Sequence, residues 1–447
     1  MWKSTTKSGE GVNLQEEQNG KNAYRFWGEK GSYFSWKKGQ VVTGILFVAA
    51  LVLYSLCMYR LFYLQSSHAF AEDIYMSDMK AYMQTMLGQE SGFDFPYPIF
   101  FWLGEFFLHF TGVEVAAALA TTVLNSLCVV LVFYYMQKYM QKYYDELRCG
   151  DWMGILTVVI TFSLFFISML FAPEGVYLPG MKHKYLGVFS PNPYHNATYM
   201  ATRPFSVVAF FIFVRILDYY EEKSNYVEFG LFGLFLFLTT MTKPSFTLVF
   251  VSAAGLVMAF RIIKSVLYDK SWRNFLPSLR LGLFFLPTFC ALLYQFGGVF
   301  GKNSLAGEEG GIGFGFASVW KVHMDNIPLA IVLALAFPGL LLLLNLKELK
   351  TNTLYRFTWF QLIVSLLEML LLYEKGDRFV HMNFSWGYMH GIFFVFMASL
   401  ILLIQNTLSG EQKWYLLVAE WLAYGWHVYC GIIYFLYIWS GQFYYCF

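Results

Sequence analysis

The chain has 447 residues, of which 57% are hydrophobic and 13% are charged, and its formal net charge is +2 at pH 7. Together with a mean hydropathy of +0.49, this composition excludes an ordinary soluble globular protein and predicts an integral membrane protein. The six cysteines have no paired spacing, so we expect neither a disulfide framework nor a cysteine-based metal site. We also expect no nucleic-acid partner.

The N-terminal segment is polar and weakly basic, and no apolar core of the signal-peptide type precedes position 41. We expect residues 1–40 to form a cytoplasmic tail, because they have too little apolar content to fold. The remainder, 41–447, is expected to be a single transmembrane domain in the cell membrane, of the bacterial plasma membrane type.

Long apolar runs bounded by charged or turn residues predict the spanning helices, each of which requires about 20 mostly apolar residues. The sequence contains eleven, at 41–64, 114–136, 152–172, 198–217, 227–242, 245–263, 278–297, 328–345, 355–373, 385–404 and 414–438. The run 227–242 is the weakest, because only the step at Lys243 and Pro244 separates it from the next. The sequence therefore predicts an all-α polytopic membrane protein with about 11 transmembrane helices.

Lysine and arginine are distributed unevenly between alternate connections. With the N-terminus inside, the cytoplasmic segments contain 21 of the 31 lysine and arginine residues, which is the bias expected of cytoplasmic loops. The connections 261–274 and 345–356 are especially compact and basic. An odd number of helices then places the C-terminus outside. The longer connections face outward and, as long ordered loops, are expected to carry function; they are 65–113, 173–197, 298–327 and 374–384.

The first outward loop begins with an amphipathic pattern over residues 73–87, which predicts a helix lying in the outer membrane interface. Asp78 and Tyr82 are four residues apart and are therefore neighbours on one face of this helix. The segment 95–112 is apolar, short and begins with prolines, so we expect a second interfacial helix there.

The remaining acids of this loop have a simpler expected role. Glu72, Glu90 and Asp94 are predicted to keep the loop in water.

Hydrogen-bonding residues are also dense in the outward stretch 180–205. His195 and Asn196 follow rigid Asn-Pro turns, which predicts an ordered polar loop over a site. His195 either contacts a substrate or caps the following helix. Arg203, at the outer end of that helix, can bind phosphate oxygens bidentately, or can extend toward lipid headgroups.

A second polar stretch, 373–391, interleaves polar and aromatic side chains around a helix start. Rings pack on the faces of sugars, and amides and charged groups bind their hydroxyls. The sugar-binding candidates here are His381, Asn383 and Trp386, although aromatic residues also accumulate at membrane interfaces. Arg378 in this stretch is a further phosphate candidate.

Lys243 lies at the predicted outer end of a helix, where a positive residue runs against the positive-inside bias. It is a third phosphate candidate, acting as a point charge, and its alternative role is contact with headgroups.

The last helix carries Glu420 and His427, which are seven residues apart and share one face. They are interpreted first as a satisfied structural pair or as interface residues, and second as the intramembrane ionisable groups that a transporter would need.

The topology, together with the sequence SDMKAYMQTMLGQ…FPYP at 77–98, resembles the GT-C superfamily of membrane glycosyltransferases. That superfamily includes the protein O-mannosyltransferases and the aminoarabinose transferases of lipid A. The match is to the Asp-x-x-x-Tyr…Gly…Tyr-Pro pattern of a first outward loop that follows the first transmembrane helix.

This resemblance implies transfer of a sugar from a polyprenyl-phosphate carrier to a glycan or lipid acceptor on the outer face. Asp78 is the residue that aligns with the family's first-loop aspartate, so it is the first candidate for the base, and Asp73 is the second. The alternative is that either acid only keeps its segment in water or caps an interfacial helix. Displacement of the lipid phosphate with a single base would invert the anomeric centre. A divalent cation is left open as a cofactor, and no metal ligands are predicted.

Two other functions remain as alternatives. One is a polysaccharide polymerase or ligase that uses undecaprenyl-diphosphate-linked glycans. The other is a non-enzymatic flippase or transporter of lipid-linked glycans, which would show internal repeats and polar groups in the middle of the membrane.

Overall fold

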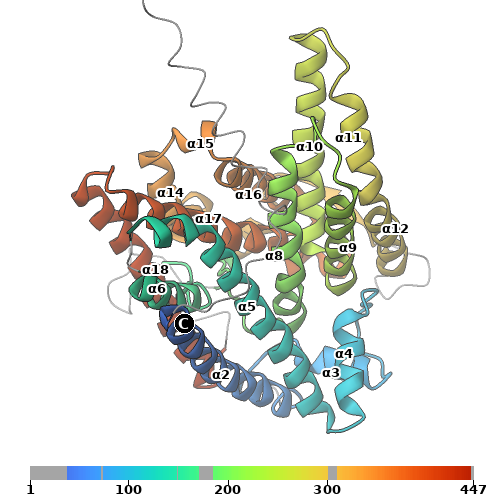
Figure 1. Ribbon diagram of the computed structural model, residues 1–447. Helices are drawn as coiled ribbons and strands as arrows, with labels where there is room; N and C mark the ends of the chain where they lie inside the picture. Colours follow the sequence, from blue (N-terminus) through green and yellow to red (C-terminus); the bar gives the residue numbers. More distant parts are fainter. Residues whose placement is uncertain (1–37, 72–73, 148–149, 171–184, 301–309, 444–447) are drawn as a thin grey trace, which may run out of the picture.

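The computed structural model describes residues 38–71, 74–147, 150–170, 185–300 and 310–443. These residues form a helical bundle with a single two-stranded sheet (Figure 1). The predicted cytoplasmic tail lies almost entirely outside the described residues, as do Glu72 and Asp73.

Nine helices of the described residues are long and apolar enough to cross a membrane. They are α2 (Lys38–Ser67), α5 (Val113–Leu147), α8 (Ala197–Leu217), α10 (Ser245–Leu267), the continuous α11, η2 and α12 (Phe275–Gly282, Leu283–Phe285 and Leu286–Phe300), α14 (Ile327–Leu344), α16 (Thr353–Leu371), α17 (Ser385–Ser409) and α18 (Trp414–Trp439). The expected all-α polytopic architecture is therefore confirmed.

The remaining elements are short. They are α3 (Met79–Met86), α4 (Ile99–Leu108), α6 (Gly150–Ser163), α7 (Tyr185–Val188), α9 (Tyr226–Thr242), α13 (Trp320–His323), α15 (Glu348–Thr351), η3 (Gly376–His381), β1 (Ile312–Phe314) and β2 (Leu372–Glu374). The two strands pair antiparallel with Gly313 opposite Tyr373. Two of the eleven predicted runs correspond to the short helices α6 and α9, so the predicted number of spanning helices and their orientation stay predictions.

The centre of the bundle is occupied by α8 and α17, whose side chains are almost all buried. The peripheral helices α2, α12 and α18 instead expose large apolar side chains such as Leu53 and Leu293. An apolar outer surface around a buried core is expected where lipid is the solvent.

The predicted run 152–172 is too long, because α6 ends at Ser163. The following backbone passes so close to α18 that a Cβ at Gly431 would lie 1.4 Å from the Phe166 carbonyl oxygen. Its carbonyl groups find partners elsewhere: Asn192 Nδ2 donates to Leu164 and to Ile167, at 3.0 Å in each case. Side chains therefore satisfy a non-helical backbone inside the bundle, as burial requires.

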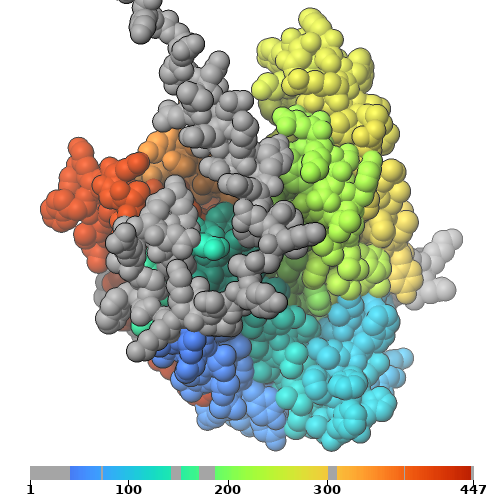
Figure 2. Space-filling model, in the orientation of Figure 1, coloured from blue at the N-terminus to red at the C-terminus, as the bar shows by residue number. Residues whose placement is uncertain are grey.

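The first predicted interfacial helix is also shorter than expected. α3 begins only at Met79, and Tyr75 lies before it in a left-handed conformation (φ 53°) with its N–H bonded to the Gly441 carbonyl at 3.0 Å. The second predicted helix is present as α4, which begins after Pro98. Figure 2 shows this α3–α4 segment packed against the ends of α9 and α12.

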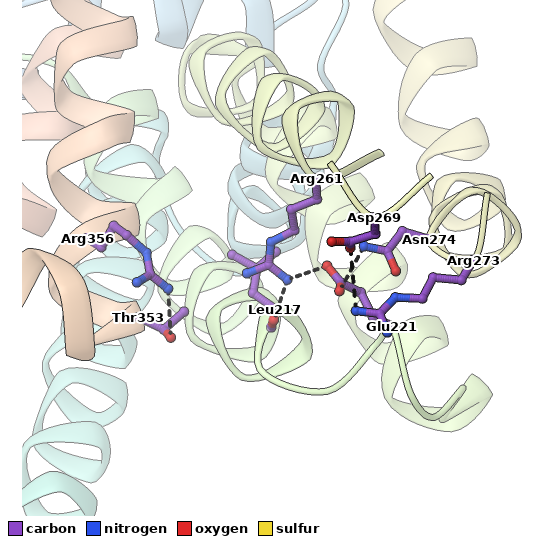
Figure 3. A network of polar contacts seen from close by, with 8 residues as sticks. All are labelled: Leu217, Glu221, Arg261, Asp269, Arg273, Asn274, Thr353 and Arg356. Atoms are coloured by element: carbon purple, nitrogen blue, oxygen red, sulfur yellow. Dashed lines mark hydrogen bonds and ion pairs between the residues drawn. The ribbon is translucent and has the colours of Figure 1, made fainter. Parts of the chain in front are cut away.

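The two basic connections lie at the same end of the bundle, after α10 and around α15 (Figure 1), and Figure 3 shows residues of both from close by. Arg261 at the end of α10 donates to the Leu217 carbonyl at 2.7 Å and to Glu221 Oε1 at 3.1 Å. Arg356 at the start of α16 donates to Thr353 at 3.3 Å nearby. We use the name basic end for this region.

Glu420 and His427 are both fully buried, but they do not form the predicted pair. Glu420 accepts from Asn345 at 3.0 Å. His427 Nε2 accepts the Phe337 N–H at 3.3 Å, next to Pro338, and Nδ1 bonds to the Ser168 carbonyl at 2.7 Å. His427 therefore bonds to backbone groups at two breaks in the helices, whereas Glu420 accepts from the side-chain amides of Asn345 and Gln412.

Candidate functional site

A cavity of about 700 Å³ opens at the opposite end of the bundle from the basic end. α8 connects the two ends, and its 21 residues span ~30 Å, about the thickness of a bilayer core. Nine of the eleven site residues expected from the sequence line the cavity: Asp78, Tyr82, His195, Asn196, Lys243, Arg378, His381, Asn383 and Trp386. The sequence motifs of three segments that are far apart in the chain thus meet in one place.

Asp78 lies at the N-terminal end of α3, but its side chain does not cap this helix. Its carboxylate Oδ2 accepts a hydrogen bond from Asn196 Nδ2 at 2.5 Å, and its backbone N–H donates to the His195 carbonyl at 3.1 Å. The carboxylate is therefore directed toward the cavity by the segment that precedes α8.

Asn196 connects the side chains of Asp78 and Lys243. Its side-chain Oδ1 caps α8 by accepting the Tyr199 N–H at 2.8 Å, and the same oxygen accepts from Lys243 Nζ at 2.9 Å. Asparagine is a favoured N-cap residue. Because Asn196 caps α8, its amide is held at the start of that helix, between Asp78 and Lys243. We call these three side chains the reaction cluster.

Lys243 lies between α9 and α10, where Pro244 prevents the first helix from continuing. Its backbone is extended (φ −168°) and its side chain is only 8% exposed. Nζ also donates to Thr198 Oγ1 at 3.2 Å and lies 4.3 Å from the centre of the Trp386 ring. The ammonium is thus fixed by two oxygens and an aromatic face.

Burial pushes the reaction cluster toward neutrality. It raises the pKa of Asp78, an effect opposed by the Lys243 charge and by the hydrogen bond from Asn196. It lowers the pKa of Lys243 to about 7, again opposed by Asp78. Burial, with a smaller contribution from Lys243, also holds the pKa of His195 well below its usual range. A carboxyl group of raised basicity beside a lysine poised near neutral pH is suited to proton transfer and anion binding.

A second polar cluster lies farther along the cavity wall. Glu374, on β2, accepts from Asn383 Nδ2 at 2.8 Å and lies 4.0 Å from Arg378 Nη1. Tyr97 lines the same cavity: burial raises the pKa of its phenol, and the charges of Asp78, Arg378 and Glu374 also act on it. We call Glu374, Arg378 and Asn383 the second polar cluster.

The remaining walls are aromatic and apolar. Trp386 packs between Lys243 and His195, and its ring centre is 5.8 Å from the imidazole of His195. On the other side, α10 and α12 contribute Leu248, Phe289 and Phe296, which are between 40% and 52% exposed. The cavity therefore combines charged, aromatic and aliphatic surfaces, as amphipathic ligands require.

Two expected site residues are not in the cavity. Arg203 is fully buried inside α8 and donates to Asn192 Oδ1 at 2.6 Å and to Asn125 Oδ1 at 2.7 Å, so the prediction that it binds phosphate has no support in its surroundings. Asp73, the second candidate for the base, lies outside the described residues.

Several residues that line the cavity were not expected from the sequence. Asp94, which was expected only to keep its loop in water, lines the cavity, and so do Tyr97, Glu374 and Gln295. Tyr97 belongs to the Tyr-Pro step and Glu374 to the polar stretch, so both signals were available. Among the described residues, no group of three or more His, Cys, Asp or Glu side chains is placed to hold a metal ion.

Comparisons of the chain with protein-family models, with curated proteins and with solved structures find no match.

Proposed function

We propose that the protein is a membrane glycosyltransferase that moves a sugar from a polyprenyl-phosphate carrier to a hydroxyl group of a glycan or lipid acceptor. The observation that supports this most is the reaction cluster, in which one amide joins Asp78 to Lys243 at the edge of an amphipathic cavity. A base and a cation joined through one amide match the two charges that develop when an acceptor attacks a phosphate-activated sugar.

The proposed chemistry is a direct displacement. Asp78 accepts the proton of the acceptor hydroxyl while its oxygen forms a bond to the anomeric carbon. The bond from that carbon to the phosphate oxygen breaks, and polyprenyl phosphate leaves with the electron pair. Attack opposite the leaving group inverts the anomeric centre.

Lys243 is the proposed first ligand of the leaving phosphate. Arrival of an anion favours the charged form of the lysine, because opposite charges in a partly desolvated site attract strongly. Arg378 lines the same cavity and is the further cationic candidate, and His381 beside it can donate a hydrogen bond.

The sugar and the lipid are assigned to different walls. The Trp386 ring can pack on a sugar face while Glu374 and Asn383 bind hydroxyl groups, and the aliphatic and aromatic side chains of α10 and α12 can contact the isoprenoid chain.

The test is to incubate the purified protein in nanodiscs with labelled polyprenyl-phosphate sugars and with undecaprenyl-diphosphate-linked glycans, and to measure the release of the carrier lipid. We expect release from at least one monophosphate donor. Turnover of diphosphate donors alone would favour the polymerase, and transbilayer movement of either lipid without release would favour the flippase.

A further inference from the structure

Arg203 is a full positive charge inside the bundle. Its side chain is 0% exposed and it makes no ion pair among the described residues. Its two hydrogen bonds go to the amides of Asn192 and Asn125, and its guanidinium lies 5.2 Å from the ring centres of Phe165 and Phe393. A charge buried without a counter-charge is costly, so it is expected to have a specific role.

The Asn192 contact extends from Arg203 to the end of α6. Asn192 Oδ1 accepts from Arg203 at 2.6 Å, while its Nδ2 holds the carbonyls of Leu164 and Ile167. Tyr194 adds a bond to the Phe165 carbonyl at 2.6 Å. The segment 190–196 is thereby fixed against the non-helical backbone that follows α6.

The Asn125 contact extends in the other direction. Asn125 Oδ1 accepts from Arg203 at 2.7 Å, and its Nδ2 donates to the Tyr54 hydroxyl at 2.8 Å. One guanidinium thus joins α2, α5, α8 and the segment 190–196. A planar group with donors in fixed directions suits this role better than lysine would.

The same segment ends at the reaction cluster. Four residues after Asn192, Asn196 donates to the Asp78 carboxylate at 2.5 Å, and the His195 carbonyl accepts the Asp78 N–H at 3.1 Å. A shift of the segment 190–196 would move both contacts together.

We propose that Arg203 is a positioning residue, whose bonds to Asn192 and Asn125 fix the segment that presents Asn196 and the His195 carbonyl to Asp78. This inference rests on the proposed function, in which Asp78 is the base. It assigns Arg203 no contact with substrate, unlike the phosphate-binding role expected from the sequence.

The test compares Arg203→Gln and Arg203→Lys with the wild type at saturating and limiting donor. Arg203→Gln is expected to lower kcat by about tenfold or more while KM for the donor changes less than about threefold, because the geometry of the base is lost and phosphate contacts are not. Arg203→Lys, which keeps a donor and the charge, is expected to recover part of kcat.

A pH profile separates positioning from general destabilisation. The groups that act on Asp78 are Lys243, His381, Tyr82 and Tyr97, and all remain in Arg203→Gln. Because the hydrogen bond from Asn196 lowers the pKa of Asp78, its weakening should move the acid limb of kcat upward by about half a pH unit or more.

Glu420→Gln is the matched control, because it alters a buried ionisable side chain whose bonds go to Asn345 and Gln412. It should change the thermal midpoint of unfolding without moving the acid limb.

Carbodiimide labelling of Asp78 against pH, read by mass spectrometry, reports the same titration without any activity. If Arg203→Gln fails to fold, Asn192→Ala is measured in its place, since it removes the same connection.

An unmoved titration of Asp78, or a raised KM with normal kcat, would overturn the positioning role. If the wild type transfers no sugar from any donor while the labelling curve of Asp78 still shifts in Arg203→Gln, the glycosyltransferase proposal is contradicted and the positioning role stands.

Discussion

At the basic end of α8, Arg261 is met directly by the carboxylate of Glu221, and Arg215 by that of Glu228. At the cavity end, Lys243 and Asp78 are connected through the amide of Asn196 instead. A direct ion pair neutralises both charges within the protein, whereas an amide orients both groups and leaves each able to act on a ligand. The two ends of one helix thus separate a structural use of charge from an arrangement suited to chemistry.

Among the residues around Asp78 and Lys243, Asn196 is the one whose substitution should lower transfer the most. Asn196→Ala removes the bridge and the cap of α8, so we expect kcat to fall by ten- to hundredfold and stability to fall by about 1 kcal/mol. Asn196→Asp is the matched control, because aspartate still caps the helix but cannot donate to Asp78. Transfer rates and thermal unfolding of both variants check this, and an active Asn196→Asp would refute the bridging role.

The second prediction concerns pH. Because the pKa of Lys243 is about 7, the lysine loses its charge as pH rises through 7, whereas the donor phosphodiester stays anionic. We expect donor affinity to fall by up to about tenfold for each pH unit above 7. Titration of donor binding between pH 6 and 9 measures it, and Lys243→Arg, which stays charged, should flatten the curve. A flat wild-type curve would remove Lys243 from the phosphate site.

A smaller effect is expected in the second polar cluster. Glu374→Gln keeps the shape of the side chain and an acceptor for Asn383 but removes the charge, so transfer should fall by about three- to tenfold. Glu90→Gln, at an exposed position between α3 and α4, is the control for loss of a carboxylate that does not line the cavity. Equal rates for the two variants would show that Glu374 does not contact the sugar.

The smallest effect should come from the basic end. Glu221→Gln breaks the partly exposed pair with Arg261, and such pairs contribute no more than about 1 kcal/mol. We expect a slightly lower unfolding midpoint and an unchanged transfer rate. A loss of transfer would mean that the two ends of α8 do not have separate roles.

The sequence was sufficient to predict the polytopic helical class and nine of the polar and aromatic residues that line the cavity. Asp78, Asn196 and Lys243 come from segments far apart in the chain, but each lies beside a helix boundary that caps, prolines or apolar runs mark. Because the outward ends of neighbouring helices lie at the same side of a bundle, residues at such boundaries can be expected to meet.

Arg203 could not be assigned in this way. α8 has apolar or small residues around most of its circumference. It therefore lacks the distinct polar face that would indicate whether position 203 faces the cavity or the bundle interior. The end of α6 was missed for a related reason. An apolar run does not reveal that the backbone will turn to pass Gly431. Nor does it reveal that Asn192 Nδ2 will donate hydrogen bonds to the carbonyl groups left without helical partners.

The most direct test of the central claim is Asp78→Asn in the purified protein, supplied with the donor that the wild type uses. The amide keeps the shape of the side chain but cannot take the acceptor proton. We predict that transfer falls by about 10²-fold or more while donor binding stays within a few-fold of the wild type. Undiminished transfer would contradict the role of Asp78 as the base.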